Sequence, residues 1–341
     1  MILSKRIIDF EKRPGIPSIL WMETLAVLLA FLISIFSGRY RVELIELFSI
    51  FTFSSDDAEL QILFWLVRLP RSVLVLTAGA ALALAGTVYQ SVFRNPLVSP
   101  DILGVSSGAS LGAVLSILLW HNTGGIAQLA SFCGGILAVV LAMGIVRASR
   151  NDSTLGFILG GVMISSVASS LVMLFKYFAD PYRQLPAIEF WMMGGFYNAD
   201  WEKVLNILPV CCLAAISIFL LRWQLKVLTL GDDEARSLGV RVKLVRGILV
   251  IAATALVAAA VSVAGLVSWV GLVAPNIVRM ITGDTSSKSL AASLGVGAVI
   301  LLLSDTLARS ITASEIPISV ITSFIGAPFL GYLLWKAGHA L

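Results

Sequence analysis

Long stretches without charged side chains limit what this chain can fold into more than any other feature. A helix rises about 1.5 Å per residue, so roughly 20 apolar residues cross a hydrocarbon core of about 30 Å. Five stretches of about that length are each predicted to form one transmembrane helix. They are residues 17–38, 72–93, 153–175, 204–221 and 316–335, and Glu23 is the only Asp, Glu, Lys or Arg in them.

Three further stretches complete the set. Residues 102–146 run for 45 residues, about 68 Å as a helix, and the polar segment 121–125 predicts a tight turn between two helices. Residues 247–278 run for 32 residues, about 48 Å, which predicts a full helix followed by a short broken one. With residues 289–304, the sequence predicts an all-α polytopic membrane protein of about ten transmembrane helices.

Composition excludes other classes. The chain is 58% hydrophobic and 13% charged, whereas soluble domains contain about 45–50% apolar and about 25% charged residues. A closed β-barrel needs alternating segments of about ten residues, but these stretches are continuous. The net charge of +4 belongs to the loops and indicates no nucleic-acid partner. Cys133, Cys211 and Cys212 lie in apolar stretches without metal-type spacing, so we expect them to be small buried hydrophobic side chains.

The basic residues predict an orientation. Threading ten helices from a cytoplasmic N-terminus places 16 of the 24 Lys and Arg residues on the cytoplasmic side, which agrees with the positive-inside rule. Both termini are then cytoplasmic, in a multi-pass protein of the cytoplasmic membrane. The single domain, residues 1–341, divides into approximate halves 1–200 and 201–341 of five helices each, and the second half is inverted relative to the first.

An internal repeat supports this division. We expect Pro96 and Pro275 to lie at mirrored helix breaks, as in inverted-repeat transporters. Backbone left unpaired at membrane depth must line protein or a cavity, so such breaks are candidate moving or pathway-lining parts. Three features recur at a constant offset of 179 residues: Ala85-Gly86 as Ala264-Gly265, Pro96 as Pro275, and Gly104 as Gly283.

Short motifs along nearly the whole chain carry a family resemblance. Arg68-Leu69-Pro70-Arg71 is followed by Asn95-Pro96-Leu97, Ser99 to Gly104, Gly271 to Pro275 and Glu315-Ile316-Pro317. In this ordered set the sequence closely resembles the FecCD family, the permeases of type II ABC importers for ferric siderophores, haem and cobalamin, and in some members molybdate or tungstate. The resemblance implies the type II importer permease fold. The chain departs from the family pattern at Asn276, where members often have His, and at Ser319, where they often have Gly.

Three arginines are expected at the outer ends of helices. The resemblance implies that Arg68, Arg71 and Arg309 dock a substrate-binding protein, because family arginines at the matching positions form salt bridges with glutamates on its two lobes. A planar guanidinium suits bidentate pairing with a carboxylate. The alternative is that these arginines anchor helix ends at the lipid headgroups. Asp305 and Glu315 are interpreted as groups at the outer rim, not as proton carriers within the membrane.

The most charged loop, residues 222–246, contains a predicted short helix. Acidic residues favour its start and a glycine favours its end. Three of its small or apolar residues share one face. The resemblance implies that this helix couples the chain to an ATPase subunit by seating that face in a cleft, and the alternative is a solvated connector. The coupling residues are Gly231, Asp232, Asp233, Glu234, Ala235, Leu238 and Gly239, of which Gly231, Ala235 and Leu238 form the shared face.

A further group is expected at helix breaks or along the pathway. The resemblance implies that the aromatic and glycine-rich segment 191–195, with Trp201, lies near the cargo entrance, although an aromatic belt at the membrane edge also explains Trp201. The candidate pathway or break residues are Gln90, Asn95, Pro96, Pro100, Gly104, Gly265, Pro275 and Asn276.

The chain contains no phosphate-binding loop of the form G-x-x-x-x-G-K-[ST], so ATP and Mg²⁺ are expected on a partner ATPase, with no cofactor or metal here. His121 and His339 are far apart and suggest no metal site. Expected partners are a second permease copy, two ATPase subunits, a periplasmic or lipid-anchored binding protein, and membrane lipid.

Two other functional classes remain as alternatives. An ion-coupled secondary transporter would need Asp, Glu or Lys in the middle of its spans, which are scarce here. A membrane-embedded enzyme would need a convergent catalytic set, which the sequence does not show. The expected cargo is a ferric siderophore, haem or cobalamin, with molybdate or tungstate as the alternative.

Overall fold

The computed structural model describes residues 16–38, 58–121, 123–149, 154–283, 287–312 and 314–338. His339 and five of the basic residues counted as cytoplasmic lie outside these ranges. The described residues form helices and no strands, and ten apolar helices agree with the number predicted. The chain is therefore an all-helical, polytopic membrane protein. Six helices have the length and hydropathy of membrane spans, namely Ala58–Val92, Gly125–Ala148, Leu155–Phe178, Trp201–Leu220, Val242–Ala264 and Ser289–Ser310, and four are shorter, namely Leu20–Phe36, Val105–Trp120, Val270–Thr282 and Ile318–Leu333.

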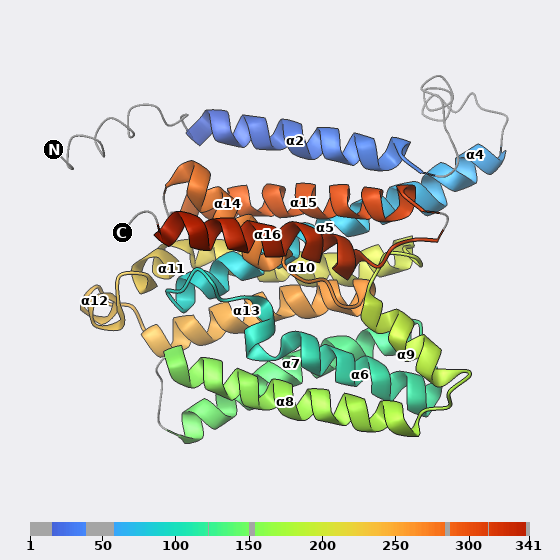
Figure 1. Cartoon of the computed structure of the whole chain (residues 1–341). Helices are drawn as coiled ribbons and strands as arrows, with labels where there is room; N and C mark the ends of the chain where they lie inside the picture. The colour runs from blue at the N-terminus through green and yellow to red at the C-terminus, as the bar shows by residue number, and fades with distance from the viewer. Residues whose placement is uncertain are drawn as a thin grey trace.

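The long helices lie roughly parallel in one bundle (Figure 1). Helix α13 packs against α5, α10 and α7, while α6, α7 and α8 pack together on one side and α2, α5 and α15 on the other. The elements are α2 (Ile16–Phe36), α4 (Ala58–Ile62), the π-helix η1 (Leu63–Arg68), α5 (Leu69–Val92), the 3₁₀-helix η2 (Pro100–Leu103), α6 (Val105–Trp120), α7 (Gly125–Ala148), α8 (Thr154–Phe178), α9 (Gln184–Met193), α10 (Trp201–Leu220), α11 (Arg222–Leu228), α12 (Asp232–Ser237), α13 (Val242–Ala264), α14 (Val270–Thr282), α15 (Ser287–Ser310) and α16 (Ile318–Gly338).

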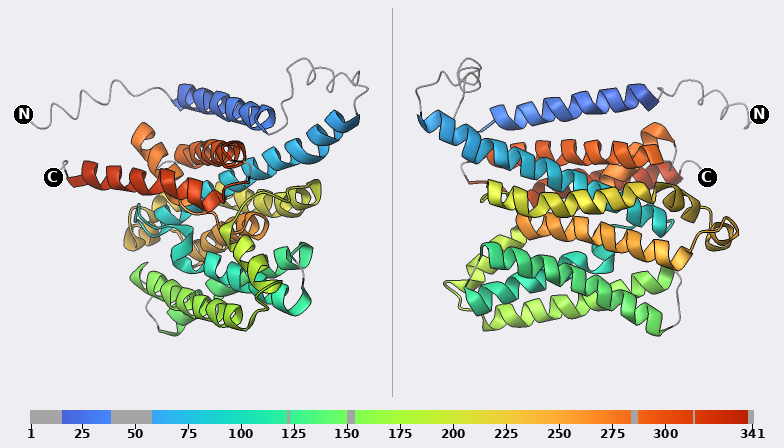
Figure 2. Two further views of the ribbon diagram at one scale, coloured as in Figure 1. Left: turned by 45° about the vertical axis from the view of Figure 1, so that its right-hand side comes forward. Right: turned by 180° about the vertical axis from the view of Figure 1, so that it is seen from behind.

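The two ends of the bundle differ. Helix α12 lies at the end where α2 begins and α16 ends, and we call this the α12 end. Helices α4 and α9 lie at the opposite end, which we call the α9 end. The views in Figure 2 show the same separation from two further directions.

The predicted division of the two longest apolar stretches is confirmed. Helix α6 ends at Trp120 and α7 begins at Gly125, so the polar segment between them forms the expected connection. Helix α13 has 23 residues and α14 has 13, which is the expected full helix followed by a short one. The short helices α9 and α11 were not predicted, because segments of ten residues or fewer carry too little periodicity to be distinguished from loops.

A π-helical turn precedes α5 and was also not predicted. Pro70 has no amide hydrogen, and in a regular α-helix its ring would clash with the carbonyl of Leu66. The amide of Leu69 instead donates to the carbonyl of Phe64, one residue further back than in an α-helix. The helix thereby continues through the proline into α5.

Close helix crossings are built on paired glycines. A Cβ atom on Gly79 would lie 2.5 Å from the carbonyl oxygen of Gly297, where α5 crosses α15. A Cβ atom on Gly86 would lie 1.7 Å from the carbonyl oxygen of Gly271, where α5 crosses α14. Such contacts bring two backbones together, which is a main source of association between helices in lipid.

The expected mirror between the two prolines is wrong. Pro96 lies in the irregular segment between α5 and η2, whereas Pro275 lies inside α14, which is helical from Val270 to Thr282. The offset of 179 residues therefore pairs a loop with a helix. Pro275 removes only the bond to the carbonyl of Gly271. That carbonyl oxygen packs instead against the backbone of α5 at the crossing just described.

Only one of the three cysteines is buried, so the expectation is wrong for the other two. Cys211 is enclosed, whereas Cys133 on α7 and Cys212 on α10 are exposed. Less than half of either helix is buried in the chain, where α7 packs against α6, α8 and α13, and α10 packs against α13 and α5. Cys133 lines an apolar hollow between α6, α7 and α8.

Candidate functional site

A buried ion cluster joins several helices at the α9 end. Arg71 on α5 donates to Asp305 of α15 at 2.7 Å and to both carboxylate oxygens of Glu315, which precedes α16, at 2.8 and 2.9 Å. Arg309 pairs with Asp305 at 3.3 Å and donates to Ser34 of α2. Asp305 is 1% exposed although it lies near the end of α15, while Glu315 remains partly exposed. Guanidinium donors thus hold both carboxylates in place.

These contacts change the interpretation of the three predicted docking arginines. Arg68, Arg71 and Arg309 are only 4%, 8% and 7% exposed. Arg68 donates to the carbonyl of Ile35 at 2.7 Å. The expectation that their guanidinium groups are accessible to a partner or to lipid headgroups is therefore not met. All three point into the chain, because the ends of α2, α5 and α15 converge there.

A second polar cluster lies where α5 meets α14. Arg279 donates to the side-chain oxygen of Asn276 at 2.7 Å and to that of Gln90. Asn276 donates in turn to the carbonyl of Pro96 at 3.0 Å and to that of Leu272 at 2.8 Å. The structure thus brings three of the predicted residues together. Arg279 was missed, because a single arginine near a helix end is typical of an interfacial anchor.

The other predicted break residues lie in separate places. The side chain of Asn95 accepts from the amide of Leu97 at 2.9 Å, and Pro100 begins η2. Gly104, with φ of +85°, precedes α6. Gly265, with φ of +67°, follows α13 and borders a pocket at the α9 end, far from the α5–α14 cluster.

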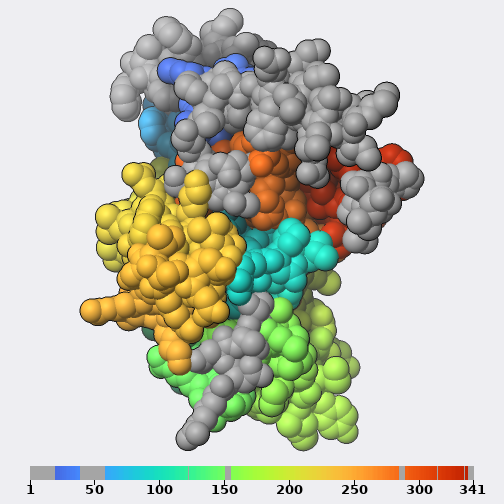
Figure 3. Space-filling model, turned by 90° about the vertical axis from the view of Figure 1, so that its left-hand side faces the viewer, coloured from blue at the N-terminus to red at the C-terminus, as the bar shows by residue number. Residues whose placement is uncertain are grey.

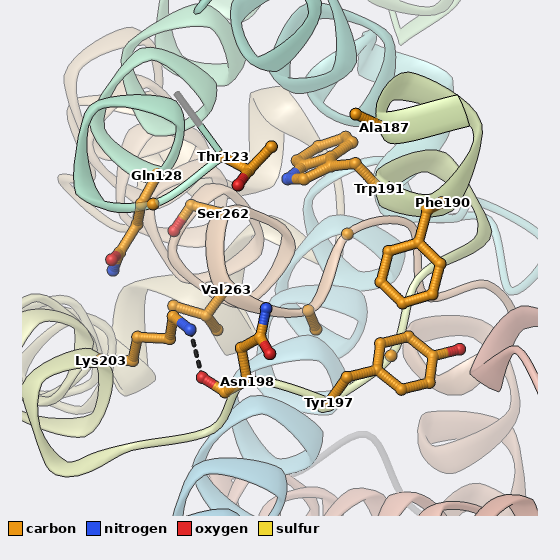
Figure 4. Close-up of a pocket in the computed structure, with 14 residues that line it drawn as sticks. Thr123, Gln128, Ala187, Phe190, Trp191, Tyr197, Asn198, Lys203, Ser262 and Val263 are labelled. Carbon is orange, nitrogen blue, oxygen red and sulfur yellow. Dashed lines mark hydrogen bonds between the residues drawn. The ribbon is translucent and has the colours of Figure 1, made fainter. Parts of the chain in front are cut away.

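That pocket encloses about 250 Å³ between the starts of α7 and α10 and the end of α13. Figure 4 shows the rings of Phe190, Trp191 and Tyr197 along one side and the side chains of Gln128 and Lys203 on the other. The pocket therefore combines aromatic faces with amide and ammonium donors. It contains part of the aromatic segment that we expected near a cargo entrance.

Trp201 has a different environment from that segment. Its indole nitrogen donates to the carbonyl of Trp65 at 2.8 Å, and its side chain is half-buried. Trp65 belongs to the π-helical turn η1. The interaction therefore connects the start of α10 to the helix that leads into α5.

At the α12 end, the predicted short helix is present. Helix α12 begins after Gly231, with φ of +143°, and ends before Gly239, with φ of +80°. Ala235 is fully buried within the chain, whereas Leu238 is 54% exposed. The expected orientation is therefore wrong, because the small-residue face packs against the chain itself. The outward side consists of Leu238 and the charged side chains around it.

Asp232 connects this loop to two long helices. Its carboxylate pairs with Arg246 of α13 at 2.6 Å and with Arg94, just after α5, at 3.5 Å. Figure 3 looks onto the α12 end and shows the segment from α11 to the start of α13 as a raised lobe beside the residues that follow α5. Because Arg94 lies four residues after Gln90, the loop is connected through the end of α5 to the α5–α14 cluster.

Comparison with known proteins places this architecture among membrane transporters. The profile of the FecCD transport family matches residues 26–336. The molybdate import system permease protein MolB of Haemophilus influenzae is 37% identical over 326 residues, which are 94% of this chain and 96% of that protein. A probable iron chelatin transport system permease protein of Helicobacter pylori is 36% identical over 286 residues, which are 84% of this chain and 86% of that protein.

A solved structure agrees over nearly the whole chain. It is an ABC transporter assigned to the metal-chelate type, in an inward-facing conformation. The two chains superpose with a TM-score of 0.83 at 36% sequence identity. The match covers 94% of this chain and 99% of that chain.

Proposed function

This chain belongs to the FecCD transport family and is the permease subunit of an ABC importer, not an enzyme, and from that premise we propose that it carries a metal chelate across the cytoplasmic membrane by alternating access. Ferric siderophores, haem and cobalamin form the proposed cargo class. The family profile covers residues 26–336, which include all ten apolar helices except the first turns of α2. The match over this whole range is the observation that carries the proposal.

The charge-free faces of α8 and α16 support a large cargo with an organic shell. Helix α8 is the least buried of the six long spans, and it lies on the same side of the bundle as α16 (Figures 1 and 2). Neither residues 155–175 nor residues 318–335 include a charged side chain. We place these faces along the path between two copies. A chelate whose charges are enclosed by its ligand loses less hydration there than a bare oxyanion does.

Molybdate is the second candidate, because the relative named for molybdate import is similar over nearly its whole length. A divalent oxyanion needs hydrogen-bond donors along its route. Lys203 and Gln128, which line the pocket at the α9 end, are donors of that kind. In this alternative, the pocket is the first site in the permease that binds the oxyanion after it leaves a binding protein.

The complete importer proposed here contains two copies of this chain, two ATPase subunits that bind ATP and Mg²⁺, and a periplasmic or lipid-anchored binding protein. We place the ATPase at the α12 end, where Leu238 and the charged residues Asp233, Glu234 and Arg236 face outward. The start of α2 and the end of α16 are then cytoplasmic. The binding protein docks at the α9 end, where buried Arg68, Arg71 and Arg309 hold the helix ends in position without touching it.

Transport in proteoliposomes tests the function and the cargo together. The chain is reconstituted with its ATPase and binding protein, and uptake of a labelled ferric siderophore and of labelled molybdate is measured with ATP, without ATP and with ionophores. We expect ATP-dependent uptake of the chelate that ionophores leave unchanged. Uptake of molybdate alone would select the second candidate. Uptake that requires an ion gradient but no ATP would contradict the importer.

A further inference from the structure

The irregular segment between α13 and α14 ends in a tight turn at Trp269. The backbone of Trp269 has φ of +71° and ψ of −33°, and the amide of Val270 donates to the carbonyl of Ser268 at 2.9 Å. A γ-turn with a positive φ is rare and strained. Strain of this kind persists only where surrounding contacts hold it, and such residues gather at switch regions. The contacts of the Trp269 side chain therefore indicate what the strained turn holds in place.

The indole ring of Trp269 lies against α16, near the middle of that helix. Its nitrogen donates to the hydroxyl of Ser323 at 3.1 Å. A Cβ atom on Gly326, one turn further along α16, would lie 2.4 Å from Cγ of the ring. The ring therefore occupies the space that a side chain at position 326 would fill. The strained turn thus fixes one point of α16 against the start of α14.

Helix α16 is enclosed by the chain up to that point and not beyond it. It packs chiefly against α14 and α15 (Figure 1). Its buried residues, among those that the structure describes, are Ile318, Thr322 and Gly326, which lie on one face of the helix. Between residues 327 and 336, none of the residues whose exposure the structure describes is buried. The first half of α16 is therefore fixed against the bundle, whereas the half at the α12 end is not enclosed.

A proline marks the boundary between the two halves. Pro328 lies inside α16, where it removes the hydrogen bond to the carbonyl of Phe324. Both residues are exposed, so the described chain does not cover this turn of the helix. Sharp bends in helices occur at such prolines. Pro209 inside α10 is the contrasting case, because α10 has buried residues on both sides of it and is held against the bundle along its length.

We propose that Trp269 is a positioning residue for transport. It holds α16 at Gly326, and residues 327–338 swing about Pro328 against this fixed point. The inference rests on the proposed function, which places α16 along the path between two copies. A swing of this half of α16 then opens and closes the path at the α12 end, while the ion cluster before the start of α16 stays in place.

Distances between spin labels test the swing in the complete importer, reconstituted in lipid with its ATPase and binding protein. In a chain whose native cysteines are replaced by serine, one label pair is Leu244→Cys, Lys336→Cys at the α12 end. The control pair is Leu205→Cys, Val320→Cys at the α9 end, and all four positions are exposed. A change of about 20° in the bend at Pro328 moves residue 336 by about 4 Å. We expect trapping with ATP and vanadate to shift the first distance by about that amount and to leave the second unchanged.

Substitutions at the contact test the role of Trp269. Trp269→Ala removes the ring, so ATP hydrolysis should continue while cargo uptake per ATP falls several-fold and the first label pair no longer shifts. A merely structural defect would lower hydrolysis and uptake together. Trp269→Phe keeps an aromatic ring at this position and should retain most of the uptake. Gly326→Ala places a methyl group in the ring and should impair uptake, but it should add little to Trp269→Ala, where the ring is absent.

Gly331→Ala is the matched control on the same helix, because a Cβ atom there meets nothing within 4 Å. Equal losses of uptake from Gly326→Ala and Gly331→Ala would show that Trp269 does not position α16. ATP-dependent uptake by wild type with an unchanged distance between residues 244 and 336 would overturn the swing, as would equal shifts of the two label pairs. Failure of wild type to take up cargo with ATP would instead contradict the proposed function itself.

Discussion

Arg71 and Arg309 share the carboxylate of Asp305 in a place where water has little access. A charge taken out of water loses several kcal/mol of hydration, on the order of the whole stability of a domain, unless a partner with good geometry replaces it. Asp305 has two such partners, and Arg71 also has Glu315. The cluster is therefore stable as a set, and removal of one member leaves the others as buried charges with too few partners.

Replacement of Arg71 tests this dependence. Arg71→Met is expected to lower the free energy of unfolding by about 3–5 kcal/mol, because it leaves buried Asp305 with Arg309 as its one remaining cation among the described residues. Glu315→Gln should cost under about 1 kcal/mol, since its side chain is partly exposed and retains hydrogen-bonding oxygen. Denaturant unfolding in detergent, followed by tryptophan fluorescence, measures both values. Equal losses would show that Asp305 does not depend on Arg71.

Among the helices, close approach of backbones replaces the hydrophobic driving force that lipid removes. The crossing of α5 with α14 illustrates this, because two features act together there. Pro275 leaves the carbonyl of Gly271 without its helical partner, and Gly86 lets the backbone of α5 approach that carbonyl. Hydrogens on Cα atoms form weak hydrogen bonds with such oxygens.

Gly86→Ala tests the crossing. The added methyl group would overlap the Gly271 carbonyl oxygen, so we expect a loss of about 1–3 kcal/mol in the free energy of unfolding as α5 and α14 move apart. Gly144→Ala on α7 is the control, because a Cβ atom there meets nothing within 4 Å. It should be neutral or stabilise the helix by about 0.5–1 kcal/mol. A neutral Gly86→Ala would contradict the close approach.

The proposed contact of the α12 loop with the ATPase gives a prediction about which side chains of α12 face outward. Leu238→Asp places a charge on the outward side of α12 and should weaken copurification of the ATPase roughly tenfold or more, as expected for an apolar contact residue, without lowering the melting temperature of the chain. Ala235→Glu should instead lower that melting temperature, because Ala235 is enclosed by the chain. Tyr182→Asp, highly exposed at the opposite end, is the control for ATPase binding. Normal ATPase binding by Leu238→Asp would contradict the orientation of α12.

The number of helices, the connection at residues 121–125 and the short helix α14 were predictable, because each depends on the length of an apolar stretch and its local breaks. The environments of Arg71 and Ala235 could not be predicted from the sequence. An arginine at a helix end and an alanine in a loop are compatible with either a buried or an exposed position, and the choice depends on which helices meet there. The wrong prediction of a helix break at Pro275 has the same origin. A proline in a sequence predicts a break, because the contact that replaces its missing hydrogen bond is visible only in the structure.

The two sides of the bundle differ in what they can contact. Residues 155–175 of α8 and 318–335 of α16 contain no charged side chain, whereas Arg147 and Lys243 border the hollow between α7, α10 and α13. In a symmetric pair, each contact of α8 with α16 occurs twice. We place the interface of the proposed dimer on the first side.

Cysteine cross-linking tests this arrangement. In a chain whose native cysteines are replaced by serine, the double variant Met173→Cys, Phe324→Cys should be joined into dimers by a bifunctional maleimide, because both positions are highly exposed on α8 and α16. The pair Leu213→Cys, Leu220→Cys on α10 is equally exposed and should remain monomeric. Dimers from the α10 pair and none from the first pair would reverse the assignment of the two sides.

The two ion pairs of Asp232 have a consequence that extends to both membrane faces. They fasten the loop that we propose to contact the ATPase to α13 and to the end of α5, and α5 continues to Arg71 at the other end of the bundle. If nucleotide state changes how the ATPase holds this loop, thermodynamic linkage requires reciprocity. Any factor by which ATP binding alters affinity for the binding protein must equal the factor by which the binding protein alters affinity for ATP. A substitution that removes the charge of Asp232 should bring both of these affinity factors closer to 1, and by the same amount.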